Sequence, residues 1–303
     1  MKVRLGVDLG GTKIEIVALD PEGRELVRRR VPTPASQGYD AVVGTIVGLV
    51  TNVERELGAV GTLGVGTPGA LSPATGLLRN SNTTCLNGRP LDRDLSDALG
   101  REVRLANDAN CFALSEATDG AAADASIVFG VIVGTGTGAG VVVRVGDTRR
   151  VLGGANAIAG EWGHMPLPWP SDDERPGPSC YCGRAGCVET FLSGPGLAAD
   201  HLRVTGEALE GPAIALGDTE AKRATLERHA DRFARSLAVV LDVLDPDVVV
   251  LGGGVGQMAH LYDALPARLA RYVFSDVVRT RIVPPMHGDS SGVRGAAWLG
   301  ASG

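Results

Sequence analysis

The sequence lacks the features by which several classes of protein are recognised. Its 303 residues carry a formal net charge of −6, so the charge gives no reason to expect nucleic acid or an anionic membrane surface as a partner. No apolar run approaches the length that spans a bilayer. The apolar run before Asp8 is too short for the core of a signal peptide. We therefore expect a cytoplasmic protein that binds neither nucleic acid nor a membrane.

Cysteine and aromatic residues are scarce, whereas glycine is abundant. The chain has five cysteines, 4% aromatic residues and 43 glycines. Three of the cysteines lie close together, which argues against a disulfide framework and for a reducing compartment. The glycines gather in clusters beside predicted strands, where a backbone can approach a ligand closely. This clustering points toward phosphate as a ligand.

One stretch, residues 160–189, has the composition of a metal site. A histidine precedes three cysteines that stand in a glycine-broken loop. Three thiolates and an imidazole complete a tetrahedral zinc set, and the glycines allow the tight turns that bring the sulfurs together. The alternative is a surface histidine with three unrelated buried thiols, but the surrounding glycine and proline suit neither a core helix nor a core strand. We predict a structural Zn²⁺ ion whose ligands are His164, Cys180, Cys182 and Cys187.

Hydrophobic periodicity divides the chain into two halves that begin in the same way. In the first half a three-stranded meander is followed by alternating helices and strands: strands 3–7, 15–19 and 25–31, helix 40–57, strand 63–67, helix 91–99, strand 103–106 and helix 109–118. In the second half a hairpin again comes first: strands 127–133 and 140–145, helix 220–244, strand 248–251, helix 261–272, strand 281–283 and helix 293–299.

This repetition predicts two similar α/β lobes that face each other across a cleft. We expect the N-terminal lobe to comprise residues 1–119, joined by a C-terminal helix at 290–303. The C-terminal lobe then comprises residues 120–289. Because no low-complexity linker separates them, we expect a packed hinge near Gly120.

A glycine loop joins the first two predicted strands. Its backbone N–H groups can point at phosphate oxygens, and a threonine adds a hydroxyl donor. The loop is neither a Walker loop nor a Rossmann fingerprint; the structural alternative is a type I′ hairpin turn, for which Gly-Gly is common. Asp8, at the end of the strand, is placed to hold Mg²⁺ through water. The predicted phosphate-binding residues are Asp8, Gly10, Gly11, Thr12 and Lys13.

Two further glycine loops strengthen the prediction of a nucleotide. Residues 134–138 occupy in the second half the position that the first loop has in the first, so two loops can clamp one polyphosphate. Residues 252–254 follow a buried strand and suit the close approach of adenine and ribose. The predicted ATP-binding residues of these loops are Gly134, Thr135, Gly136, Gly253 and Gly254.

The pair Asn107-Asp108 stands where a strand ends and a helix begins. The structural interpretation is a helix N-cap, a role that aspartate fills well. The functional interpretation makes Asp108 the general base that takes the proton from a substrate hydroxyl as this attacks phosphorus. The sequence pattern leaves both open.

Taken together, these motifs resemble the ROK family of sugar kinases and repressors, over essentially the whole chain. The resemblance rests on residues 8–13, on Asn107-Asp108, on residues 160–164 and on the cysteine cluster through Glu189. Residues 87–90, 106–111 and 287–298 are more narrowly similar to its bacterial fructokinase or mannokinase branch. The resemblance implies an actin-like ATPase fold, with two ribonuclease-H-like lobes and a nucleotide and sugar cleft between them. It also implies a homodimer.

The activity implied by the resemblance is transfer of the γ-phosphoryl group of ATP to the 6-hydroxyl of a hexose. Asp108 would be the base, and His164 would serve both zinc and sugar. Fructose is the expected acceptor, with mannose or glucose competing. Ala70 stands where many kinases of N-acetylated sugars carry a polar residue, which argues weakly against such a substrate. The implied sugar-binding residues are Gly69, Asn82, Asn107, Asp108, Glu161, His164 and Glu189.

Other readings remain. Within the family, the chain could be a glucokinase, an N-acetylmannosamine kinase or another sugar kinase. A repressor needs a DNA-binding domain ahead of the first glycine loop, and Met1 is close to Asp8. A zinc hydrolase needs an open coordination position, whereas four protein ligands close the tetrahedron. A sugar-binding regulator without catalysis would have no need of Asp108.

Overall fold

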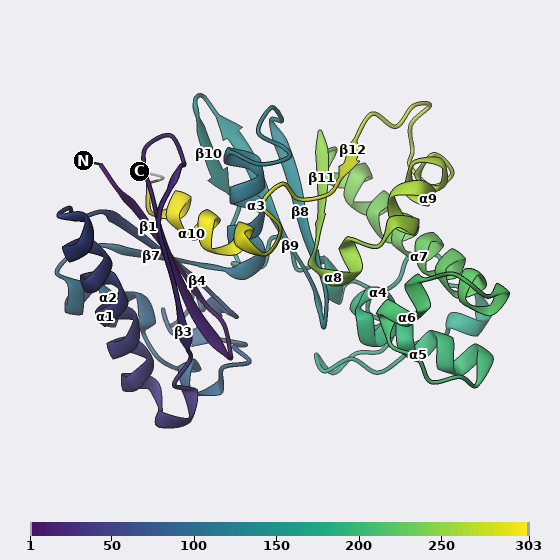
Figure 1. Cartoon of the computed structure of the whole chain (residues 1–303). Coiled ribbons are helices and arrows are strands. Elements are labelled where there is room, and N and C mark those ends of the chain that lie inside the picture. The colour runs from purple at the N-terminus through teal and green to yellow at the C-terminus, as the bar shows by residue number, and fades with distance from the viewer. Residues whose placement is uncertain (1, 302–303) are drawn as a thin grey trace. The chain divides into compact units, whose positions relative to one another are not determined.

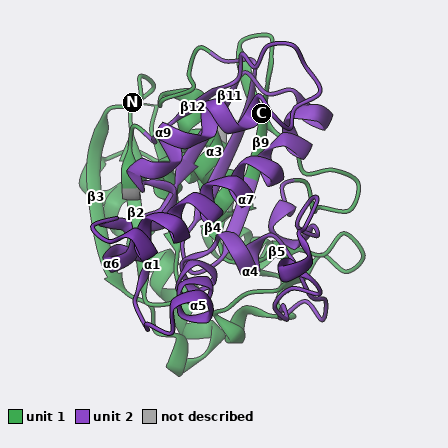
Figure 2. Cartoon of the chain, turned by 90° about the vertical axis from the view of Figure 1, so that its right-hand side faces the viewer, with its two compact units in different colours: residues 1–124, 140–159, 286–303 green, residues 125–139, 160–285 purple. Residues whose placement is uncertain are grey.

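The computed structural model describes residues 2–301. Its contacts divide the chain into two compact units (Figure 2): unit 1 is Met1–Asp124, Gly140–Ala159 and Met286–Gly303, and unit 2 is Ala125–Ala139 and Gly160–Pro285. The lobe boundaries drawn from the sequence, at residues 119 and 289, stay a prediction. Residues 302 and 303 of the predicted C-terminal helix lie outside the described residues.

Unit 1 is built on a five-stranded sheet in the order β3-β2-β1-β4-β7. The strands are β1 (Arg4–Leu9), β2 (Lys13–Leu19), β3 (Glu25–Pro32), β4 (Thr62–Thr67) and β7 (Val103–Asn107). The first three are antiparallel, which confirms the predicted meander, and β4 and β7 run parallel to β1.

Helices cover both faces of this sheet because side chains alternate along its strands. On β2, Ile14 and Ile16 pack in one core cluster with α1 (Tyr39–Leu57) and α2 (Leu91–Leu99). Val17 and Leu19 point the other way, toward α10 (Ser291–Ala301). Helix α10 also packs on α3 (Asp108–Thr118) (Figure 1). It lies so close to β1 that a Cβ on Gly6 would come within 2.1 Å of the Val293 carbonyl oxygen.

The second sheet has the order β10-β9-β8-β11-β12. Its strands are β8 (Ile127–Val133), β9 (Thr137–Val145), β10 (Thr148–Val151), β11 (Val248–Gly252) and β12 (Arg281–Val283). Numbered along the chain within each sheet, both sheets therefore read third, second, first, fourth, fifth. The duplication read from the sequence is present in the topology, although the sequence did not reveal β10.

A helical layer follows the second hairpin. Its members are α4 (Glu189–Leu192), α5 (Gly194–Thr205), α6 (Gly211–Ala215), α7 (Glu220–Leu244), α8 (Gly253–Gly256) and α9 (Ala259–Leu269). Phe233 of α7 and Phe129 of β8 each lie edge-on to Trp162, with ring centroids 5.9 and 5.7 Å away. This aromatic contact ties the long helix to the sheet.

The predicted long elements are present, with small errors at their ends. The helix predicted at residues 261–272 corresponds to α9, which ends at Leu269. The sequence analysis missed α4, α5 and α6, as well as the two-residue strands β5 (Ala70–Leu71) and β6 (Leu78–Arg79). It also missed the short helix α8, which begins within the third glycine loop at Gly253. Short 3-10 helices are η1 (Ala35–Gln37), η2 (Thr84–Leu86), η3 (Trp162–His164), η4 (Asp172–Glu174) and η5 (Gly288–Ser290). Within residues 2–301, no helix is both long and apolar enough to cross a membrane.

Candidate functional site

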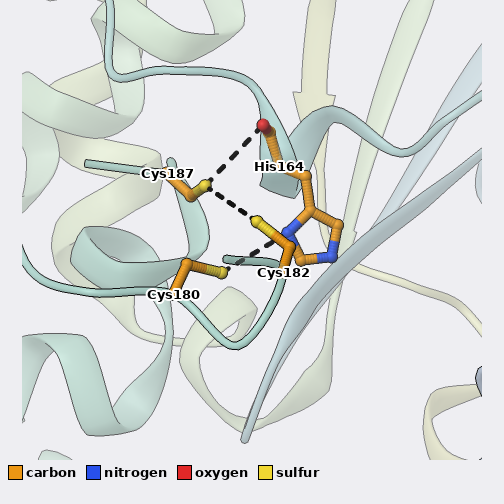
Figure 3. A group of neighbouring side chains, drawn as sticks. All are labelled: His164, Cys180, Cys182 and Cys187. Carbon is orange, nitrogen blue, oxygen red and sulfur yellow. Dashed lines mark hydrogen bonds between the residues drawn. The ribbon is translucent and has the colours of Figure 1, made fainter. Parts of the chain in front are cut away.

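In unit 2 the loop before α4 folds back on η3 and gathers the predicted metal ligands (Figure 3). Backbone bridges join Pro166 to Cys187 and Ser179 to Ala185, so the loop is a small pinned hairpin. At its tip, Gly183 has a φ of 87°. Only glycine adopts this left-handed backbone readily, and the tight turn sets the cysteines on either side of it facing the same point.

The four ligand atoms fit a zinc ion. The His164 nitrogen and the three cysteine sulfurs all lie within 4.8 Å of one another. Nδ1 of His164 is 3.6 Å from Sγ of Cys180, and Sγ of Cys182 is 3.6 Å from Sγ of Cys187. A tetrahedron with Zn–S bonds of about 2.3 Å has S···S edges of about 3.8 Å. Four protein donors complete such a tetrahedron, which is the arrangement of a structural site.

The second ring nitrogen of His164 has a neighbour that the sequence analysis missed. Nε2 lies 2.9 Å from the hydroxyl of Tyr181, and the two rings meet edge-on with centroids 5.1 Å apart. Tyr181 is 83% exposed. A sugar hydroxyl that bonds to Nε2, as the resemblance implies, has to share or displace this contact. In the sequence, Tyr181 stands between Cys180 and Cys182, and this position was the one feature that could have pointed to its contact with His164.

Glu189 joins the loop that carries the three cysteines (residues 178–187, called the zinc loop below) to the second glycine loop. Its Oε2 accepts a hydrogen bond of 2.8 Å from the backbone N–H of Thr137. Within the loop, the N–H of Gly134 donates to the carbonyl of Gly136 at 2.9 Å. Unit 2 thus brings Glu189, the zinc ligands and the second glycine loop into one connected structure. Glu161, the residue before η3, is exposed beside it.

The third glycine loop is shaped by close packing on one side and openness on the other. Gly253 has a φ of 78°, and a Cβ there would come within 2.3 Å of the Val133 carbonyl oxygen. A Cβ on Gly254 would meet nothing within 4 Å. The loop is therefore fixed against β8 while Gly254 leaves room for a ligand.

In unit 1 the structure separates the roles of Asn107 and Asp108. Asn107 is the N-cap of α3, because its side chain accepts the N–H of Asn110 at 2.8 Å. Asp108 is the first residue of the helix, and its Oδ1 accepts the neighbouring N–H of Ala109 at 2.8 Å. The interpretation of Asp108 as the cap is wrong. Its side chain is exposed, so the carboxylate is open to a substrate.

The pKa values of the Asp8 and Asp108 carboxyls in unit 1 are both raised. Desolvation, followed by the negative charges of Asp108 and Glu15, raises the pKa of Asp8 to about 6. Lys13 and Arg30 act in the opposite direction. Although the side chain of Asp108 is reached by solvent, protein surrounds its carboxyl densely, and this desolvation raises its pKa as well. Perturbed carboxyls of this kind are frequent at functional sites.

The first glycine loop is not the type I′ turn considered above. Such a turn needs left-handed backbone at both central residues, and neither Gly10 nor Gly11 has it. The N–H of Gly10 donates to the carbonyl of Lys13 at 2.9 Å, which closes the loop. A Cβ on Gly11 would lie 4.0 Å from Oδ1 of Asn82, so the exposed amide of that residue stands beside the loop.

Gly69 is fixed by its backbone between β4 and β5. Its φ is 86°, and a Cβ there would come within 2.3 Å of the Arg79 carbonyl oxygen. Unit 1 therefore carries the first glycine loop and the predicted site residues Asp8, Gly69, Asn82, Asn107 and Asp108. Unit 2 carries the other two glycine loops, Glu161, Glu189 and the zinc ligands.

Comparison with known proteins gives the same answer for sequence and for fold. The model of the ROK family matches residues 4–302. N-acetyl-D-glucosamine kinase of Pectobacterium atrosepticum is 39% identical over 303 aligned residues, with 97% of each chain covered. The enzyme of the same name from Escherichia coli O127:H6 is 40% identical, with 97% of this chain and 98% of the relative covered.

Solved structures match over the same length. A ROK hexokinase from Thermus thermophilus superimposes with a TM-score of 0.85 at 34% identity, covering 98% of this chain and 97% of that one. A ROK glucokinase from Streptomyces griseus, in complex with glucose and AMPPNP, has a TM-score of 0.74 at 26% identity, covering 99% and 100%. These matches bear out the actin-like ATPase fold that the resemblance implied.

The comparisons do not support the narrower part of the resemblance. The sequence pointed to the fructokinase or mannokinase branch, whereas the relatives named above act, by name, on N-acetyl-D-glucosamine. They favour the alternative of another sugar kinase in the same family.

Proposed function

Because the chain belongs to the ROK family, we propose that it is an ATP-dependent sugar kinase. Its reaction transfers the γ-phosphoryl group of ATP to the 6-hydroxyl of a hexose, with N-acetyl-D-glucosamine as the first candidate acceptor. The observation that carries the proposal is the Asp108 carboxylate, exposed at the start of α3 and relieved of the capping role by Asn107. The identity of 39–40% to N-acetyl-D-glucosamine kinases supports the choice of acceptor.

Asp108 supplies the acid–base chemistry. Its carboxylate accepts the proton of the acceptor hydroxyl as the oxygen attacks phosphorus. A base of this kind works best when its pKa lies near the working pH, and desolvation moves the pKa of Asp108 upward from that of an ordinary carboxyl. The raised pKa makes the carboxylate a stronger base than a solvated aspartate.

The zinc loop holds the acceptor. Glu161, His164 and Glu189 carry the polar groups that we assign to sugar hydroxyls, together with Gly69, Asn82 and Asn107 of unit 1. Zinc bound to the three cysteines and His164 would contribute rigidity and no chemistry. The N–H of Thr137 binds one carboxylate oxygen of Glu189, and we assign the other oxygen to a sugar hydroxyl.

The glycine loops hold the nucleotide. Backbone N–H groups of the first and second loops bind the phosphates, and the third loop accommodates the adenosine. Asp8 would hold Mg²⁺, which neutralises phosphate charge when bound. Desolvation raises the pKa of Asp8, and repulsion from Asp108 and Glu15 adds to it; a cation beside Asp8 would offset that repulsion.

Fructose or mannose is a second candidate acceptor, on one specific observation. Ala70, directly after Gly69, pairs with Arg79 in a two-residue ladder and offers no polar group. Many kinases of N-acetylated sugars in this family carry a polar residue at that position. Recognition of an N-acetyl group then has to come from elsewhere in the pocket.

A coupled ADP-release assay of the purified chain against a hexose panel tests the proposal. We expect N-acetyl-D-glucosamine to give the highest kcat/KM. Turnover at least about tenfold faster on fructose or mannose moves the assignment to the second candidate, since tenfold corresponds to about 1.4 kcal/mol of discrimination. If no sugar in the panel raises the rate of ADP release above the rate without sugar, the assignment as a sugar kinase is rejected.

A further inference from the structure

A buried glutamate stands beside the first glycine loop with no role in the site described so far. Glu15 of β2 is 1% exposed. In the sheet register it lies directly opposite Asp8 of β1. Like charges placed opposite each other across two strands are destabilising, and a buried carboxylate is costly unless it is paired. Glu15 therefore has to be explained by what it holds.

Three cations surround the Glu15 carboxylate. Arg28 pairs with Oε1, and Arg30 donates to Oε2 from Nε at 3.0 Å and from Nη2 at 2.7 Å. The ammonium of Lys13 lies 3.9 Å from the same Oε2. Arg28 is held further by Oγ of Ser290 at 2.8 Å, and Glu25 approaches it to 3.8 Å. The charge of Glu15 is thus shared mainly with Arg28 on one oxygen and Arg30 on the other, and Lys13 lies at the edge of the cluster.

The register aligns this cluster with the loop. Asp8, Glu15 and Arg30 form one row across β1, β2 and β3. Lys13, two residues before Glu15 on the same strand, points to the same face. Glu15 is buried, whereas the side chains of Lys13 and Arg30 are 44% and 51% exposed. A fixed anion therefore anchors two cations whose outer parts remain open to a ligand.

The same two cations act on Asp8. Both Lys13 and Arg30 act to lower the pKa of its carboxyl, as expected of cations close to the position predicted for magnesium and phosphate. A guanidinium is also suited to phosphate, because its planar donors match the geometry of phosphate oxygens.

We propose that Arg30 is a phosphate-binding residue for the terminal phosphate of the nucleotide and that Glu15 is the positioning residue that holds it there. The inference rests on the proposed function, since it assigns residues to the nucleotide side of that site. The competing explanation is a cross-strand ion pair that only stabilises the sheet. Arg29 offers the matched control. It lies next to Arg30 on β3 and pairs with Glu56 at 3.0 Å, where it is 52% exposed.

Calorimetric binding of AMPPNP and of AMP to the full chain, with Mg²⁺, separates these explanations. Arg30→Gln should weaken AMPPNP binding by about tenfold through loss of a charge-assisted contact, and should leave AMP binding unchanged. Glu15→Gln should also weaken AMPPNP binding. Arg30→Lys should bind AMPPNP more tightly than Arg30→Gln but less tightly than the wild type. The Arg29→Gln control should bind both nucleotides like the wild type.

Two results overturn the inference. One is unchanged AMPPNP binding in Arg30→Gln, and the other is a loss of affinity in that variant that is equal for AMPPNP and for AMP. If Glu15→Gln does not fold, the Arg30 variants still decide. Because binding needs no turnover, a wild type that binds AMPPNP but phosphorylates no sugar defeats the proposed function alone. An active kinase with normal AMPPNP binding in Arg30→Gln defeats this inference alone.

Discussion

At the start of α3, two adjacent polar side chains have different tasks. The Asn107 oxygen accepts the N–H of Asn110 and caps the helix, whereas Oδ1 of Asp108 accepts the N–H of the neighbouring Ala109. From the sequence, either residue could have been the cap, because both types are favoured there. The geometry leaves the carboxylate for chemistry and assigns the stabilising role to the amide.

We therefore expect Asp108→Asn to lose turnover by about 10²–10⁴-fold, since a positioned base contributes that much. Its melting temperature and its affinity for the sugar should stay close to those of the wild type. The contrasting variant, Asn107→Ala, should lower the free energy of unfolding by about 1 kcal/mol through loss of the cap. Steady-state kinetics and thermal unfolding measure both. Near-normal turnover in Asp108→Asn would contradict the assignment of the base.

At the scale of elements, the zinc loop is a short segment whose fold depends on its ligands. The loop from Pro178 to Cys187 has little regular structure: one backbone bridge joins Ser179 to Ala185 within it, and another joins Cys187 to Pro166. Its shape follows from the convergence of three sulfurs and one imidazole nitrogen within 4.8 Å. Because the binding energy of a structural zinc ion is coupled to folding, loss of a ligand should affect both metal content and stability.

The variant Cys182→Ser tests this coupling. We expect substoichiometric zinc by elemental analysis and a lower melting temperature, with the loss of sugar affinity that follows from a disordered loop. Cys85→Ser is the control. Cys85 lies at η2, outside the cluster, so this substitution removes a thiol that is not a predicted zinc ligand. Purified wild-type protein without zinc would refute the structural metal site.

A second element, η4, is held by buried charge. Glu174 is 8% exposed and bonds to Nε of Arg232 at 2.7 Å and to Nη2 of Arg235 at 2.8 Å. These arginines belong to α7, so the ion pairs fix the segment that follows His164 onto this long helix. Burial acts to raise the pKa of Glu174, but the bonds to Arg235 and Arg232 outweigh it and hold the pKa at about 2.

Glu174→Gln should lower the free energy of unfolding by about 3 kcal/mol at neutral pH, which is the lower end of the cost of breaking a buried ion pair. The lower end applies because Arg232 keeps Asp200 and Arg235 keeps Asp231 as partners. A carboxyl with a depressed pKa stabilises the fold above its unfolded value of 4.5 and loses this contribution as the pH falls toward about 2. The difference in unfolding free energy between wild type and variant should therefore shrink on acidification. Urea unfolding at about pH 7 and about pH 3 measures it. A difference that stays constant would contradict the linkage.

At the scale of the whole molecule, the duplicated topology could be predicted from the sequence and much of the detail could not. Long apolar runs and amphipathic periods mark the helices α1, α7 and α10 and the strands of both five-stranded sheets except β10. By contrast, β5 and β6 are two residues each, too short for any period to show. Helices α4 and α5 follow a glycine-rich and proline-rich loop whose composition hides them.

The candidate site divides in the same way. The convergence of His164 and the three cysteines could be predicted because all four lie in one stretch with a characteristic spacing. The row of Asp8, Glu15 and Arg30 could not, because it exists only once the register of three strands is fixed. The identity of the sugar is harder still. Hexoses differ by the position of one polar group, and the pocket discriminates through contacts that composition does not encode.

The central claim is transfer of phosphate from ATP to the 6-hydroxyl of a sugar. The most direct measurement is ³¹P NMR of a reaction containing the purified chain, ATP, Mg²⁺ and N-acetyl-D-glucosamine, with the 6-deoxy sugar as control. The account predicts one phosphomonoester signal coupled to the two C6 protons, formed in step with ADP, and no such signal from the 6-deoxy sugar. Inorganic phosphate as the sole product, or phosphate on another carbon, would contradict it.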